Sequence, residues 1–138
     1  SLFKEPLELT SPVKPPLLQS KSLTLKDLNG QWVLTLEDGH CLRDEALDYC
    51  FSAGAKEDTL FQATFLETLR YMVASGMGIT LIPELAIKDG EHGLRYTHFN
   101  APVPSREICL LVRPNYSRME CVRAVVSSIR SSMSPYIK

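Results

Sequence analysis

The sequence predicts an α/β domain in which helices cover a mixed or parallel sheet. Short apolar runs of strand length alternate along the chain with stretches of helical spacing, and turn residues separate most of them. The 138 residues, 44% of them hydrophobic, are enough to build one core. We find no repeat and no low-complexity segment.

The first part of the chain is predicted to contain two strands and a short helix. An apolar run at residues 6–10 indicates a strand, and three prolines predict an irregular crossing over residues 11–22. Residues 24–28 form a short helix between a capping threonine and an Asn-Gly turn. The apolar residues at 32–36 then indicate the next strand.

Helices and strands continue to alternate through the middle of the chain. Apolar residues at helical spacing predict helices over residues 41–53 and 65–75, the second ended by glycine. Apolar runs predict strands at residues 59–63 and 79–82.

The last third of the chain completes the pattern. Pro83 opens a helical turn, and strands follow at residues 94–99 and 107–113. The segment 117–132 is an amphipathic helix, whose apolar positions predict that it packs against another surface.

Charge excludes some classes of partner. Fifteen Lys and Arg balance sixteen Asp and Glu with no run of either sign, so we expect no nucleic-acid binding by this chain alone. No apolar stretch has the length of a membrane span and no secretory signal is visible, which predicts no membrane contact and a cytoplasmic location.

Two cysteines mark the helix predicted at residues 41–53. Cys41 lies in its first turn, with Asp38 or Gly39 suited to the cap. Unpaired N–H groups and the helix dipole stabilise a thiolate there, and the thiolate is the reactive form. Arg43 either adds to this stabilisation or is a solvated side chain.

Cys50 lies nine residues further along the same predicted helix. Nine steps of helix separate the two Cα atoms by roughly 13 Å, whereas a disulfide needs them within about 7 Å. A bond between them therefore requires the helix to unwind, which would make it easy to reduce. Two unrelated buried thiols are the other interpretation of this spacing.

The remaining cysteines are predicted to be part of the core. Cys109 lies in a continuous apolar run, and Cys121 shares a helical face with apolar residues. No pair of cysteines has the close spacing of a zinc site, so we expect no structural metal.

Three segments carry a resemblance to a known family. They are Leu-Glu-Asp-Gly-His-Cys-Leu-Arg-Asp at residues 36–44, Ala-Thr-Phe-Leu-Glu-Thr-Leu-Arg at 63–70 and Gly-Met-Gly-Ile-Thr-Leu-Ile-Pro at 76–83. Together they closely resemble the peroxide-sensing LysR-type transcription regulators of bacteria. The first segment is specific to the sensors, and the third is common to LysR-type effector domains.

The resemblance implies a periplasmic-binding-protein-like (LysR effector-binding) fold of two lobes. The chain would leave the first lobe, build the second and return. Residues 1–102 would then form the second lobe, and residues 103–138 a strand and helix of the first. The N-terminal helix-turn-helix domain that reads DNA in the family has no counterpart here.

The resemblance also implies roles for four residues. Cys41 matches the peroxide-reactive cysteine and Cys50 the resolving cysteine, which pair as a redox-active disulfide. His40 and Arg106 match residues that the family places near the thiolate. An imidazole can donate a hydrogen bond to peroxide and a guanidinium can stabilise the thiolate, although a turn histidine and a surface arginine are the ordinary alternatives.

The function implied is hydrogen peroxide sensing by a transcription activator that assembles as a homo-oligomer. DNA and RNA polymerase would be partners of the whole regulator, and glutaredoxin or thioredoxin would reduce the disulfide. No cofactor is implied. Each oxidation would be stoichiometric, so the chain would be a switch and not an enzyme.

Two other classes stay open. One is a LysR-type regulator that responds to a small-molecule ligand, and the other is a thiol peroxidase, although no Cys-x-x-Cys motif is present.

Phe65 departs from the small hydroxyl residue usual in the sensors, at a position that faces the effector cleft in other LysR-type proteins.

Overall fold

The structure is a computed structural model that describes residues 1–13, 23–37, 39, 41–87 and 93–136. Its strands are β1 (Phe3–Pro12), β2 (Trp32–Leu36), β3 (Lys56–Ala63), β4 (Thr80–Pro83), β5 (Leu94–Thr97) and β6 (Ser105–Ile108). Its helices are α1 (Cys41–Ser52), α2 (Leu66–Ala74) and α3 (Met119–Ser132), with 3-10 turns η1 (Leu25–Leu28), η2 (Glu84–Ala86) and η3 (Ser134–Tyr136).

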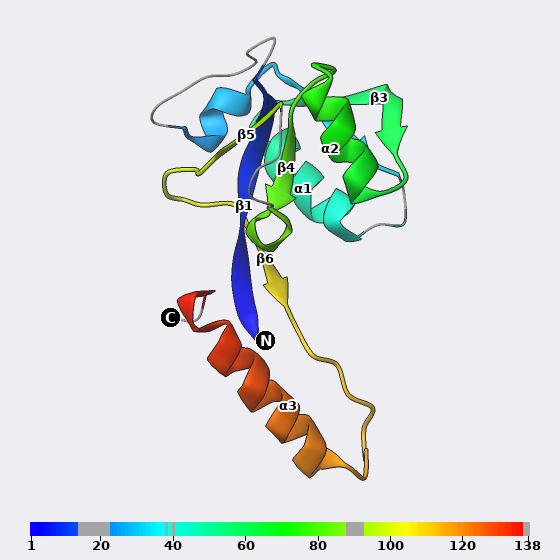
Figure 1. The fold of residues 1–138 in the computed structure, drawn as a ribbon, viewed down its shortest axis with the longest axis vertical. Helices are drawn as coiled ribbons and strands as arrows, with labels where there is room; N and C mark the ends of the chain where they lie inside the picture. Colours follow the sequence, from blue (N-terminus) through cyan, green and yellow to red (C-terminus); the bar gives the residue numbers. More distant parts are fainter. Residues whose placement is uncertain (14–22, 38, 40, 88–92, 137–138) are drawn as a thin grey trace.

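Strand β1 is the centre of the molecule (Figure 1). Its second half pairs antiparallel with β4 on one edge and with β5 on the other, and its first half pairs antiparallel with β6. Because it has neighbours on both edges, β1 is buried along almost its whole length.

Strands β2 and β3 form a parallel pair with an irregularity between Val33 and Thr35. The backbone N–H of Leu34 donates to the carbonyl of Ile79, and Val33 forms a parallel bridge with Ile79, which places β2 beside the start of β4. Parallel and antiparallel pairing, both expected of a mixed arrangement, therefore occur in a four-stranded antiparallel sheet and a two-stranded parallel sheet that this bridge links.

The core has two parts, on opposite sides of β2. On one side, Val33 and Cys50 belong to a cluster of buried residues that includes apolar side chains of β1 and β4. On the other side, Leu34 and Leu36 pack with α2 through Leu69. Helices therefore cover both faces of the sheet, as the sequence predicts.

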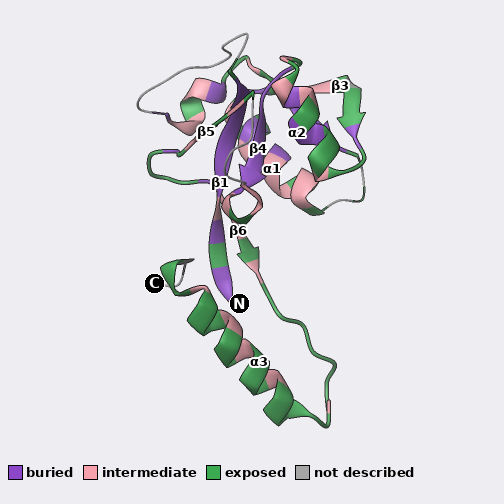
Figure 2. Ribbon diagram, viewed as in Figure 1, coloured by how far each residue is buried: buried purple, intermediate pink, exposed green. Residues whose placement is uncertain are grey.

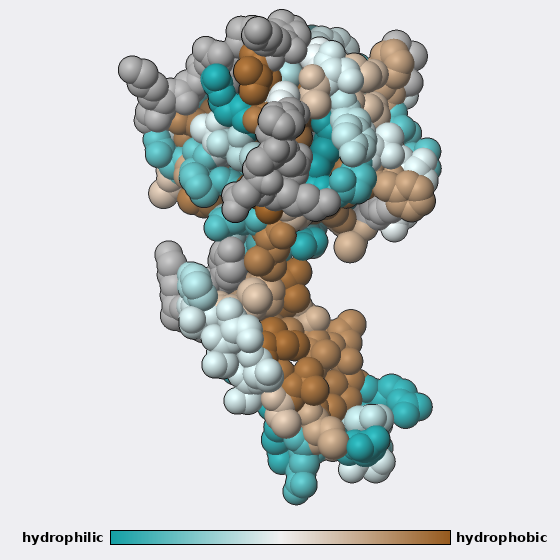
Figure 3. All heavy atoms as spheres, in the orientation of Figure 1, coloured by the Kyte–Doolittle hydropathy of each residue, from teal (hydrophilic) through white to brown (hydrophobic). Residues whose placement is uncertain are grey.

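Helix α3 stands apart from this body (Figure 2). It contains no buried residue, and the segment that joins it to β6 is exposed through most of its length. Figure 3 shows hydrophobic surface gathered where α3 and this segment lie. Among the described residues, no helix has both the length and the apolar character needed to cross a membrane.

Most predicted elements are present, but the strand predicted at residues 107–113 is shorter. It begins at Ser105 and ends at Ile108, because the pairing with β1 stops at Phe3. Residues 109–113 have no strand partner in the part of the chain that the structure describes. Much of the predicted crossing at 11–22 lies outside the described residues.

Candidate functional site

Helix α1 carries both cysteines of the predicted switch. Cys41 is its first residue and is exposed, whereas Cys50 lies in its last turn and is fully buried. Both are free thiols. The prediction that they lie on one continuous helix is confirmed, so a bond between them requires α1 to change shape.

A glycine stands close to the start of this helix. Gly39 has φ +96°, a left-handed conformation that glycine adopts without strain. Asp38, a predicted cap, and His40, a predicted site residue, lie outside the described residues.

Arg43 ties the first turn of α1 to the parallel strand pair. Its Nη1 donates to Glu57 Oε1 at 2.5 Å, to Thr35 Oγ1 at 3.1 Å and to the carbonyl of Leu36 at 3.1 Å. The Arg43 and Glu57 side chains are only 12% and 13% exposed. The alternative that Arg43 is a solvated side chain is therefore wrong, because its guanidinium anchors the helix.

Glu57 is the acidic centre of this network. The hydrogen bond from Arg43 is the main reason that the pKa of its carboxyl lies below the usual range. Hydrogen bonds from Thr35 and Gln62 act in the same direction, and burial opposes them. Glu57 therefore remains charged under neutral and mildly acidic conditions.

Cys50 lies in the larger part of the core, where apolar side chains replace water. Burial raises the pKa of this thiol to about 12, so it is protonated at neutral pH. Gly54 lies just beyond α1 with φ +89°, a conformation that favours glycine. A Cβ at this position would also lie 2.3 Å from Asn29 Oδ1.

The end of α1 is also linked to β6. Tyr49 Oη donates to the carbonyl of Ser105 at 2.9 Å. The next residue, Arg106, donates from Nε to Glu5 Oε2 at 2.7 Å, and the other oxygen of Glu5 accepts from the backbone N–H of Leu85 at 2.8 Å. Arg106 thus pairs with a fully buried carboxylate, not with either cysteine of α1.

The prediction that Cys109 and Cys121 belong to the core is wrong for this structure, because both are exposed. Cys109 follows the end of β6, where no strand covers it among the described residues, and Cys121 lies on the exposed helix α3. Phe65 precedes α2 and is 66% exposed, so its ring is available at the surface.

The sequence interpretation missed Glu5, Tyr49 and Glu57. Their partners lie 101, 56 and 14 residues away along the chain, so no local spacing signals the contacts. Glu5 offers an indirect signal, as an acidic residue next to a predicted strand.

The family model of the LysR substrate binding domain matches residues 1–134 of the chain. The hydrogen peroxide-inducible genes activator of Haemophilus influenzae is 48% identical over 131 residues, which cover 91% of this chain and 44% of that protein. The DNA-binding transcriptional dual regulator OxyR of Escherichia coli K12 is 44% identical over 134 residues, which cover 96% of this chain and 44% of that protein. The chain thus spans less than half the length of these curated relatives.

Solved structures agree with the sequence matches. The crystal structure of the oxidized form of OxyR superposes with a TM-score of 0.82 at 42% identity, over 99% of this chain and 66% of that one. The reduced form superposes with a TM-score of 0.81 at 38% identity, over 96% and 62%. With a family model matched over almost its whole length, this chain belongs to the LysR substrate-binding domain family.

Proposed function

We propose that this chain is the redox-sensing part of a hydrogen peroxide-responsive LysR-type transcription regulator, switched by a reversible Cys41–Cys50 disulfide. One observation carries the proposal: an exposed free thiol begins a helix, and a second, fully buried free thiol lies in its last turn. The names of relatives that are 44–48% identical point the same way.

The proposed reaction has two steps. The Cys41 thiolate attacks one oxygen of hydrogen peroxide, the O–O bond breaks, and sulfenic acid and hydroxide form. The Cys50 thiol then displaces the sulfenic oxygen, which leaves as water, and the disulfide forms. In total two thiols lose two electrons, and one peroxide is reduced to two waters.

The unequal environments of the two thiols suit these two roles. Exposed Cys41, at the first residue of α1, can meet peroxide in solution. Cys50, with a pKa of about 12, holds its proton and does not compete for peroxide. It becomes a resolving thiol only when α1 opens and releases it from the core.

Opening α1 is the conformational part of the proposal. Disulfide formation would disrupt backbone hydrogen bonds of the helix, at about 1 kcal/mol net each. Because Arg43 holds the first turn and Tyr49 holds the last, unwinding would also disturb β2, β3 and the start of β6. The disulfide would thereby shift α1 from its helical arrangement to an unwound one.

Other parts of the proposal concern the site's surroundings and the whole regulator. His40 would donate a hydrogen bond to peroxide. Arg106 would stabilise the thiolate once it is released from Glu5. Residues 1–102 and 103–138 would belong to different lobes. The regulator would act in the bacterial cytoplasm as a homo-oligomer on DNA with RNA polymerase, and glutaredoxin or thioredoxin would reduce it.

Thiol mapping by mass spectrometry after one equivalent of hydrogen peroxide tests this proposal. We expect a Cys41–Cys50 disulfide in the wild type, and a dimedone-reactive sulfenic acid at Cys41 in Cys50→Ser. Cys41→Ser should lose both products. The matched control is the double variant Cys109→Ser, Cys121→Ser, which removes the two other exposed thiols and should form the disulfide normally.

A different pattern would contradict the proposal. If Cys41→Ser consumes peroxide as fast as the wild type, or if the double variant loses the reaction, Cys41 is not the sensing thiol. Repeated turnover with added reductant, at a rate typical of an enzyme, would favour a peroxidase instead.

The family match supports a second candidate, a regulator that responds to a small-molecule ligand, since the matched model is a substrate binding domain. A ligand that saturates and raises the melting temperature while all four thiols stay reduced would favour it.

A further inference from the structure

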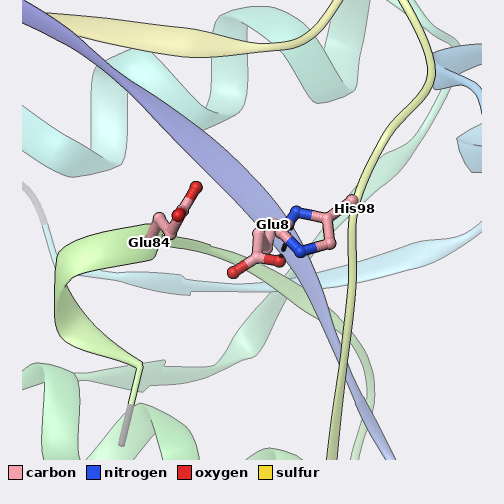
Figure 4. Close-up of side chains that lie close together, drawn as sticks. All are labelled: Glu8, Glu84 and His98. Atoms are coloured by element: carbon pink, nitrogen blue, oxygen red, sulfur yellow. Dashed lines mark ion pairs between the residues drawn. The ribbon is translucent and has the colours of Figure 1, made fainter. Parts of the chain in front are cut away.

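Three side chains that can bind a metal converge beside the central strand. They are Glu8 of β1, Glu84 of η2 and His98, which follows β5, and one ligand atom from each lies within 4.8 Å of the other two. Figure 4 shows Glu8 between the other two. His98 Nδ1 and Glu8 Oε1 are 2.7 Å apart.

Strand pairing, and not a loop, brings these residues together. Leu9 lies opposite Thr97 in the β1–β5 pair, so the next position along each strand brings Glu8 to His98. Glu8 also pairs with Ile82 on the other edge, two residues before Glu84. The sheet therefore fixes the position of Glu8, and Glu84 and His98 directly follow the two strands that pair with β1.

The buried carboxylate lies in a place that favours positive charge. Glu8 is 3% exposed, and a carboxylate oxygen of Glu84 lies within 4.8 Å of its carboxylate. A cation between the two carboxylates would offset both their repulsion and the loss of hydration.

Thr10 gives an independent observation on the same face of β1. It lies two residues along β1 from Glu8, and therefore on the same face of the strand. Its hydroxyl is buried and has no hydrogen-bond partner among the described residues. A water molecule held by a cation at Glu8 would be a suitable partner for it.

We propose that Glu8, Glu84 and His98 bind a divalent first-row transition ion. One imidazole and two carboxylates suit Mn²⁺, Fe²⁺ or Zn²⁺, and three protein ligands leave positions for water. Two ligands at about 2.1 Å from one ion are at most about 4.2 Å apart. The three ligand atoms lie within 4.8 Å of one another, close to this limit, and the 77% exposed His98 side chain has room to adjust.

Mn²⁺ is the probe that separates this site from the cysteines, because it prefers oxygen and imidazole ligands to thiolates. The signal of free Mn²⁺ in electron paramagnetic resonance is recorded during titration of the reduced protein. We expect one ion per chain, with affinity at least about tenfold lower in His98→Ala and in Glu84→Gln. Both changes are made at residues outside the buried core, so the variants should fold.

Two controls define the result. Glu107→Gln removes an exposed carboxylate from the neighbouring strand β6, and Cys41→Ser removes an exposed thiol; both should bind Mn²⁺ within twofold of the wild type. Circular dichroism verifies that each variant is folded. The proposal is overturned if millimolar Mn²⁺ does not bind, or if folded His98→Ala and Glu84→Gln bind it as well as the wild type.

Discussion

At the scale of single residues, the Arg43–Glu57 pair decides how firmly the start of α1 is held. Both side chains are mostly buried, and one guanidinium nitrogen serves two side chains and a backbone carbonyl. A mostly buried pair of this kind is costly to break on one side only, because the remaining charge keeps its desolvation cost without a partner.

We predict that Glu57→Gln lowers the free energy of unfolding by roughly 2–3 kcal/mol at pH 7. The pKa of Glu57 is lowered in the folded protein, so its contribution is present above the ordinary carboxyl pKa and is lost as pH falls through the folded value. The difference from wild type should therefore shrink at pH 3. Urea unfolding at both pH values measures it, with Glu107→Gln as an exposed control expected to change stability by less than about 0.5 kcal/mol. An equal difference at both pH values would mean that charge is not the cause.

At the scale of elements, α1 differs from the other helix of the core in how it is held. Helix α2 presents Leu69 and Val73 to the core along one face. In α1 only Leu47 and Cys50 are buried, and polar contacts fix the first turn and Tyr49. Leu42, Ala46 and Tyr49 of α1 are half-buried and pack against the core, so opening the helix would expose apolar surface as well as break these polar contacts.

We predict that oxidation raises amide hydrogen exchange over residues 41–52 and leaves α2 protected. The thiols are separated by roughly 13 Å of helix, and the bond tolerates about 7 Å, so helical hydrogen bonds must break. Hydrogen-exchange mass spectrometry of the reduced and peroxide-treated protein measures this, with Cys50→Ser as a control that forms no such disulfide. Unchanged protection in a verified Cys41–Cys50 disulfide would rule out the unwinding.

Some elements can be predicted from the sequence and others cannot, for physical reasons. The strand at Trp32–Leu36 and the start of α1 follow from apolar pattern and turn residues, which are local signals. The apolar run after Ile108 has the same local pattern, but whether it becomes a buried strand depends on a partner strand. For the same reason, the exposure of Cys109 could not be predicted.

The features of the candidate site also fall into those that the local sequence predicts and those that it does not. The sequence places Cys41 and Cys50 on one helix because helical spacing is local. The contacts of Arg106 with Glu5 and of Tyr49 with Ser105 depend on strand pairing between distant segments. Polar contacts of this kind produce no periodic pattern in the sequence.

At the scale of the whole molecule, α3 and the segment before it form an apolar surface outside the main core. Leu110, Leu111 and Val112 line a hollow with Val122 and Val125 of α3. Leu111 is 91% exposed and Val125 is 50% exposed. Exposed apolar surface of this kind favours association.

We predict that the chain self-associates at micromolar concentration and binds a hydrophobic dye through this surface. The variant Leu111→Lys, Val125→Lys should shift sedimentation toward monomer and reduce dye fluorescence, because two charges would have to be buried for association. Tyr71→Lys is the control, since Tyr71 is a 71% exposed residue of α2, away from α3. A wild-type chain that sediments as a monomer without dye binding would contradict this.

In the proposed switch, the burial of Cys50 would set the order of events in time. Collision of peroxide with exposed Cys41 would be bimolecular and would quicken with peroxide concentration, but release of Cys50 would depend only on how often α1 opens. Above some concentration of peroxide, helix opening would therefore limit the rate of disulfide formation, which would reach a ceiling. Beyond that ceiling the sulfenic acid would remain in contact with solvent, where a second peroxide can oxidise it irreversibly to sulfinic acid. The packing around one buried thiol would thus fix both the fastest response of the sensor and the dose at which it is damaged.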